Sequence, residues 1–251
     1  MKHIGKIFTV IGAFALSTNV NATILTVFDG IAAGESSFDT TVTAAGAIVT
    51  TDVWSGLSSG VSIDRGDYVI TQNDGGSGSV TTYGSLSGQA IGINPSGGGS
   101  NPRTDPMDYF NSGLTFTFTD AVNSVGFEVG DWATCCTAPT TDLFISFDGG
   151  AAIQVASANT STDGLFPSQT TGGNVFEIFV AAFDDSDYFN QVSFWGNGIG
   201  EYLVAGGQVR YASVDAGSLP PVGVPEPGSL ALLSLSLVGL GLIRRRKQHY
   251  I

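Results

Sequence analysis

Basic residues are almost absent from the middle of this 251-residue chain. Between residues 23 and 224 there is no lysine, and three arginines (Arg65, Arg103 and Arg210) stand against 21 acidic residues, which gives a formal charge of −18. Affinity for nucleic acid depends on lysine and arginine side chains that neutralise phosphates. A surface with this charge also repels anionic lipid headgroups. We therefore expect no nucleic acid among the partners of this region.

Histidine is also missing from the middle, because His3 and His249 lie at the two ends. The region between the two ends therefore has no Ser-His-Asp triad, no Cys-His pair and no histidine-ligated zinc or iron. Without lysine it has neither a Schiff-base amine nor the cation of a P-loop. Carboxylates are the main catalytic groups that remain, and no pair typical of a glycoside hydrolase can be identified. We therefore predict that the protein is not an enzyme and needs no cofactor for catalysis.

The rest of the composition favours a β-rich fold. The chain has 35 glycines, 42% hydrophobic residues and only 12% charged residues, which argues against a disordered polyelectrolyte and against a helical bundle. Short β-rich stretches recur between clusters of Gly, Asn and Asp, as in a sandwich. In one of them Leu114, Phe116 and Phe118 alternate with threonines, the period of a half-buried strand.

We predict a single all-β domain, a jelly-roll-like β-sandwich, over residues 23–217. A short helix is expected from Gly34 to Gly46, although Gly, Ser and Thr are poor helix formers. Residues 218–224 form a stiff, proline-rich spacer between this body and the C-terminal segment.

Residues 1–22 have the succession of segments that is typical of a secretory signal peptide. Lys2 and Lys6 precede an apolar run from Ile7 to Leu16, and Val20-Asn21-Ala22 provides small or aliphatic residues before a cleavage site. An apolar run of this length is too short to span a hydrocarbon core of about 30 Å. We predict cleavage after Ala22 and export of the chain.

The C-terminus carries three ordered features over residues 225–251. They are the triplet Pro225-Glu226-Pro227, an apolar segment from Leu230 to Ile243, and the basic cluster Arg244, Arg245, Arg246 and Lys247. The apolar segment is a short membrane span, and the positive-inside rule keeps the basic cluster in the cytoplasm and the body outside. A plain C-terminal anchor is the alternative, but such an anchor has no physical need for the triplet.

These residues resemble the PEP-CTERM sorting family of Gram-negative bacteria. The resemblance implies recognition by exosortase, an integral-membrane processing enzyme that cuts near the triplet. It also implies passage through the inner membrane, transient anchoring there, and an association with exopolysaccharide. Residues 113–132, 143–150 and 192–214 are similar in pattern to the jelly-roll ectodomains that such proteins carry, which supports the fold and leaves activity open.

Cys135 and Cys136 are adjacent in a chain that we expect to be exported. Their spacing fits neither a zinc ribbon nor a Cys-x-x-Cys redox pair. We predict a disulfide between them that stiffens the loop after Trp132. Because adjacent cysteines need an unusual peptide geometry, intermolecular pairing and two free thiols stay open.

Two other groups of residues are candidate binding sites. Asp184, Asp185 and Asp187 provide hard oxygen ligands for a structural calcium ion, with solvated turn residues as the alternative. Trp132 and Trp195 can stack on sugar rings if their side chains are exposed, although aromatic residues of a sandwich are more often core.

The sequence as a whole predicts a non-enzymatic protein of the cell surface or biofilm matrix, sorted through its C-terminal signal. A carbohydrate-binding module is the alternative, and a glycoside hydrolase that uses two carboxylates is a third candidate.

Overall fold

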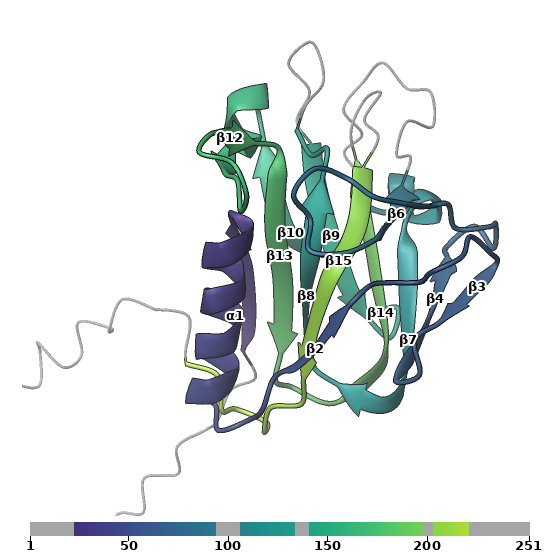
Figure 1. The fold of residues 1–251 in the computed structure, drawn as a ribbon. Coiled ribbons are helices and arrows are strands. Elements are labelled where there is room, and N and C mark those ends of the chain that lie inside the picture. The colour runs from purple at the N-terminus through teal and green to yellow at the C-terminus, as the bar shows by residue number, and fades with distance from the viewer. Residues whose placement is uncertain (1–22, 94–105, 134–140, 198–202, 221–251) are drawn as a thin grey trace, which may run out of the picture.

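The computed structural model describes residues 23–93, 106–133, 141–197 and 203–220. They form a sandwich of two antiparallel sheets with a helix against one outer face (Figure 1). Sheet 1 contains, in spatial order, β1 (Ile24–Asp29), β13 (Glu177–Asp184), β8 (Ser124–Gly130), β15 (Leu203–Ala212), β6 (Ala90–Ile93) and β5 (Val80–Thr81), while β2 (Thr50–Val53) also pairs with β15. Sheet 2 contains β10 (Ile153–Ala158), β9 (Thr141–Phe147), β14 (Phe189–Asn197), β7 (Leu114–Val122), β4 (Tyr68–Gln72) and β3 (Ser62–Asp64).

The remaining elements are short, apart from one helix. They are α1 (Ile31–Ala44), the 3₁₀ helices Pro106–Ser112 and Ser161–Gly164, and the two-stranded pair β11 (Phe166–Pro167) and β12 (Asn174–Val175). None of the helices within the described ranges is long and apolar enough to cross a membrane.

The strand pairing from β6 onward is that of a jelly roll. β6 pairs with β15, β7 with β14, β8 with β13 and β9 with β10. The chain is thus paired like one long hairpin, and its successive strands are divided between the two sheets. This double-sheet arrangement is the jelly-roll architecture. The prediction of an all-β, jelly-roll-like sandwich is confirmed.

Alternation along the strands builds the core between the sheets. Leu114, Phe116 and Phe118 of β7 are buried, as their spacing predicts, and they meet Val125 and Phe127 of β8 from the opposite sheet. The rings of Phe116 and Phe127 stack with centroids 5.5 Å apart. The inner face of each strand is therefore apolar, which leaves the outer faces for other contacts.

Helix α1 covers part of the outer face of sheet 1 (Figure 1). Its buried residues, Ile31, Gly34, Phe38 and Val42, follow a helical spacing. Phe38 packs against Phe179 and Phe183 of β13 with ring centroids 6.1 and 4.9 Å apart. The helix was expected from Gly34 and begins three residues earlier, because Ile31 also belongs to its buried face.

Strand β15 changes partner at a bulge. Its first half, up to Gly206, pairs with β6, and its second half, from Gln208, pairs with β2. Gly206 and Gly207 have φ of +138° and +60°, and a Cβ on Gly206 would lie 2.2 Å from the ring of Trp54. Glycine is therefore required at Gly206 both by backbone conformation and by the indole packed against it.

Candidate functional sites

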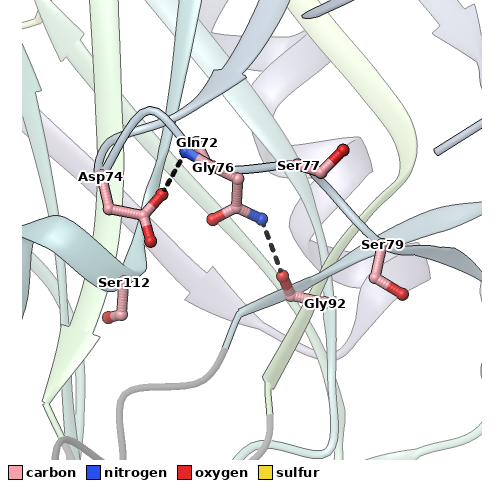
Figure 2. Close-up of a pocket in the computed structure, with 7 residues that line it drawn as sticks. All are labelled: Gln72, Asp74, Gly76, Ser77, Ser79, Gly92 and Ser112. Carbon is pink, nitrogen blue, oxygen red and sulfur yellow. Dashed lines mark hydrogen bonds between the residues drawn. The ribbon is translucent and has the colours of Figure 1, made fainter. Parts of the chain in front are cut away.

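A polar cavity of about 250 Å³ opens beside the end of β4. Figure 2 shows its lining residues: Gln72, Asp74, Gly76, Ser77, Ser79, Gly92 and Ser112. The Gln72 side chain donates from Nε2 to the carbonyl oxygen of Gly92 at 3.2 Å. Asp74 accepts the backbone N–H of Gly76 at 2.7 Å, which shapes the turn after β4.

This cavity presents hydrogen-bonding groups and no ring. Three serines, one carboxylate and one amide line it, and none of its seven lining residues is aromatic. Such groups can exchange hydrogen bonds with the hydroxyls of a small polar ligand. Its chemistry therefore fits a polyhydroxylated compound better than an apolar one.

A second candidate site lies on the outer face of sheet 1, where two carboxylates hold one loop. Glu128 of β8 accepts the backbone N–H of Ser87 at 2.7 Å. Glu177 of β13 accepts the N–H of Ser85 at 2.9 Å and also the Ser85 hydroxyl. Glu128 lies opposite Phe179 in the register, so the two glutamates are diagonal neighbours on one face. We call Glu128 and Glu177 the carboxylate clamp.

The two members of the carboxylate clamp differ in how fully they are bonded. Glu128 is 0% exposed, and its Oε1 atom has no hydrogen-bond partner among the described residues. Burial, with a smaller contribution from the nearby Glu35 of α1, raises the pKa of Glu128 to about 7, against the opposing effect of its bonds with Ser87. A carboxyl group with a pKa near 7 titrates around neutral pH. Such raised pKa values are typical of carboxylates at functional sites, and they also occur at buried structural carboxylates.

The two sheets are joined by a buried chain of hydrogen bonds. The indole N–H of Trp54 donates to the Tyr68 hydroxyl at 2.7 Å, and that hydroxyl donates to Asp52 at 2.7 Å. Arg65 holds the same carboxylate with bonds of 2.5 and 2.9 Å. Burial opposes ionisation of Asp52, but the bonds from Arg65 and Tyr68 outweigh it and hold the pKa below its ordinary value. Asp52 is therefore a charged structural group.

Both arginines that the structure describes are occupied by carboxylates. Arg65 is paired with Asp52, and Arg210 lies 3.2 Å from Glu35 and 2.8 Å from Asp39 of α1. The second pair fastens the helix to β15. Neither guanidinium is therefore available as a docking group for an anionic ligand.

The tryptophans predicted to stack on sugars are both buried. Trp195 donates its indole N–H to the carbonyl of Pro106 at 2.6 Å and stacks on Phe144 with centroids 5.8 Å apart. Trp132 packs edge-on against Phe28 with centroids 5.3 Å apart. Sugar stacking needs an exposed ring face, so the structure contradicts this prediction for Trp132 and Trp195.

The three aspartates predicted to bind calcium are neighbours in sequence, but each side chain accepts hydrogen bonds from different backbone N–H groups. Asp185 is buried and accepts two backbone N–H groups, from Thr23 and Leu219. Asp184 accepts the N–H of Ser186, and Asp187 accepts that of Tyr188. Within the described ranges no three His, Cys, Asp or Glu side chains are grouped so that they could hold a metal ion. A calcium site there stays a prediction.

Several predicted sites lie outside the described residues. They are the signal peptide, the cysteine pair Cys135 and Cys136, the triplet Pro225-Glu226-Pro227, and the basic cluster from Arg244 to Lys247.

The sequence did not point to the carboxylate clamp or to the position of Asp185. Alternation along β8 does place Glu128 on the other face of the sheet from Val125, Phe127 and Val129. That signal predicts a solvated side chain, because nothing in the sequence indicates that residues 84–89 lie over it.

Comparison with solved structures finds only distant likenesses. A family 29 carbohydrate-binding module is 12% identical, with a TM-score of 0.33, and the match covers 71% of this chain and 99% of that one. The catalytic unit of a GH87 α-1,3-glucanase from Streptomyces thermodiastaticus is 12% identical, with a TM-score of 0.32, over 71% of this chain and 28% of that one. TM-scores this low do not establish a shared fold, so the jelly-roll assignment rests on the strand pairing. No curated protein matches the chain in sequence.

Comparison with family models gives one match, at the C-terminal end. Residues 223–247 match the model of the PEP-CTERM protein-sorting motif. The match includes Pro225-Glu226-Pro227 and the basic residues up to Lys247, the features on which the resemblance was based. The chain therefore carries a PEP-CTERM protein-sorting motif behind its jelly-roll body.

Proposed function

We propose that this chain is a non-enzymatic, exported protein of the cell surface or extracellular matrix. The observation that supports export and sorting is the sorting motif over residues 223–247. An exosortase-type enzyme in the inner membrane recognises Pro225-Glu226-Pro227, cuts the tail and releases the body. The body is the cargo of this process, and its setting is an extracellular polysaccharide layer.

The chemistry of the body supports a role as cargo. Its two described arginines are used in internal ion pairs, and Glu128 and Glu177 hold a loop of the protein itself. The body has a net negative charge and a continuous aromatic and aliphatic core. A strongly acidic, folded particle stays soluble and well separated from its copies outside the cell.

The sorting step is tested by changing Pro225, Glu226 and Pro227 together to alanine. We expect full-length precursor to accumulate in the inner membrane, because the enzyme loses its rigid recognition element while the apolar segment is unchanged. Mass spectrometry of the termini after cell fractionation measures this. As a matched control, Pro220 and Pro221 are changed to alanine, which leaves the triplet intact. A triplet variant that is trimmed and distributed like the wild type contradicts the proposal.

Carbohydrate binding is the second candidate function, and the polar cavity favours it. Its serines, Asp74 and Gln72 offer both donors and acceptors to sugar hydroxyls. This site replaces Trp132 and Trp195 as the candidate binding surface, since both rings are buried. Binding here would rest on hydrogen bonds without a stacking platform, so we expect it to be weak.

The cavity is tested with a broad glycan panel and the exported protein. Ser79 is exposed at the cavity, so Ser79→Trp should fill it and weaken any binding at least tenfold. Ser157→Trp is the control, because Ser157 is exposed on β10, at the edge of sheet 2 far from β4. Isothermal titration measures the affinity. Absence of binding to every glycan removes the candidate, whereas hydrolysis of a glycan would instead support an enzyme.

A further inference from the structure

One buried aspartate joins the two ends of the described body. Asp185 is 0% exposed, and its Oδ1 atom accepts the backbone N–H of Thr23 at 2.5 Å. Its Oδ2 atom accepts the backbone N–H of Leu219 at 3.1 Å. The backbone N–H of Asp185 returns a bond to the carbonyl oxygen of Thr23 at 3.3 Å. Both carboxylate oxygens are thus used, one for each end.

The two ends meet because of how the outer strands are arranged. Ile24 begins β1 and lies opposite Asp184, so Thr23 is placed beside Asp185 by the register. After β15 the chain is held by Asn123, whose side chain exchanges two hydrogen bonds of 2.8 Å with the backbone of Val214. The segment that follows passes the lower end of α1, where Leu219 is buried among residues such as Phe38 (Figure 1).

Signal-peptide removal changes the chemistry of this contact. Hydrolysis of the bond between Ala22 and Thr23 gives Ala22 a new carboxylate, and water supplies its oxygen and the protons for a new amine on Thr23. The nitrogen that donated as a neutral amide then becomes a primary ammonium at neutral pH, because an α-amino group has a pKa of about 7.7–8.0. The group facing Asp185 changes from an uncharged donor to a cation.

A cation at this position meets a carboxylate that is already fixed and desolvated. The amide of Thr23 already forms a charge-assisted bond with this carboxylate, and a cation in its place adds a direct Coulomb attraction, which is strong where solvent is excluded. A buried ion pair stabilises only when its geometry is good and its remaining donors and acceptors are bonded. The carboxylate meets its part of this condition, since its other oxygen accepts the backbone N–H of Leu219.

We propose that Asp185 is an acceptor site for the α-ammonium that signal-peptide cleavage creates on Thr23. Cleavage then forms an ion pair that locks β1 to the segment leading into the sorting tail. This inference rests on the export proposed above and on cleavage after Ala22. It makes the folded body more stable after processing than before it, and it holds the base of the C-terminal spacer at the same carboxylate.

The test uses the full chain, exported from cells and purified, with its N-terminus read by mass spectrometry. One glycine inserted between Ala22 and Thr23 moves the ammonium one residue away and leaves every side chain unchanged. We expect the wild type to begin at Thr23 and the insertion variant to melt about 5 °C or more lower. Asp185→Asn should also lower the melting temperature, and in that background the insertion should have no further effect. Asp120→Asn, at an exposed acid of β7, is the matched control.

A second measurement does not require the Asp185→Asn variant to fold. The wild-type amine should react slowly with an amine-acylating reagent, because it is held by a buried carboxylate, and the inserted glycine should react at least tenfold faster. A mature chain that begins elsewhere overturns the proposal. So does an insertion variant that melts and reacts like a wild type that begins at Thr23, a result that leaves export and sorting intact.

Discussion

At the scale of single residues, Glu128 has the least favourable environment that the structure describes for a carboxylate. It is fully buried, one oxygen accepts a bond from Ser87, and the other has no partner among the described residues. Its neighbour Glu35 is also acidic, and Glu177 is diagonal to it on β13. Leaving a buried acceptor unsatisfied costs free energy, and an ionised one costs more. The protein tolerates this cost at the point where residues 84–89 are fastened to sheet 1.

This environment predicts that stability falls as the pH rises from about 4.5 to about 7. The native state binds the proton of Glu128 more tightly than the unfolded state, so this group destabilises the fold only where it must ionise. Its penalty is absent below about pH 4.5, grows up to about pH 7 and is then constant. A rise of the pKa from 4.5 to about 7 corresponds to about 3 kcal/mol. Glu128→Gln should remove this loss, as measured by urea unfolding between pH 4.5 and 8.

The control for this prediction is Asp120→Asn, because Asp120 is an exposed acid at the end of β7. It should leave the pH dependence of the unfolding free energy nearly unchanged. If Glu128→Gln shows the same pH dependence as the wild type, the interpretation of Glu128 as a proton-binding group near neutral pH is wrong.

At the scale of elements, β15 and α1 form the surroundings of Glu128 in the carboxylate clamp. The bulge at Gly206 and Gly207 lets one strand pair with β6 and then with β2. A Cβ on Gly207 would clash with the carboxylate of Glu128, so glycine at this position leaves room for that side chain. Helix α1 covers the neighbouring part of the same face and contributes Glu35. Propensity alone favours no helix in this segment, so its stability comes from the buried stripe that includes Phe38.

At the scale of the whole molecule, net charge is the dominant property. The region from residue 23 to 224 has a formal charge of −18, and the two described arginines are already paired. Repulsion among the remaining carboxylates opposes compactness at low salt. Cations in the surroundings relieve this repulsion, either by general screening or by binding at a site.

The predicted calcium site at Asp184, Asp185 and Asp187 is tested through the stability of the whole protein. Calcium bound at 100 times its dissociation constant stabilises a fold by about 2.7 kcal/mol, which raises the melting temperature by about 5–10 °C. Magnesium demands a tighter octahedral arrangement, so a specific calcium site should gain less from it. Melting in calcium, magnesium and chelator at matched ionic strength measures the difference. Equal gains from both ions indicate charge relief, and equal melting temperatures in all three rule out the site.

The sequence by itself determined the features that depend on order and composition along the chain. The sorting motif is a linear signal, the acidic balance is a count, and the β-sandwich follows from alternation such as that of Leu114, Phe116 and Phe118. None of these requires knowledge of which segments meet in space.

Only the tertiary structure decided which side chains are covered and what they contact. Trp132 and Trp195 could line a surface or a core, and packing against Phe28 and Phe144 put them in the core. The alternation along β8 predicts that Glu128 faces solvent, but the loop that contains Ser87 covers it. Asp185 meets Thr23 and Leu219 only because β1 pairs with the distant strand β13 and the chain after β15 returns to the same place, and no local sequence pattern indicates such a contact.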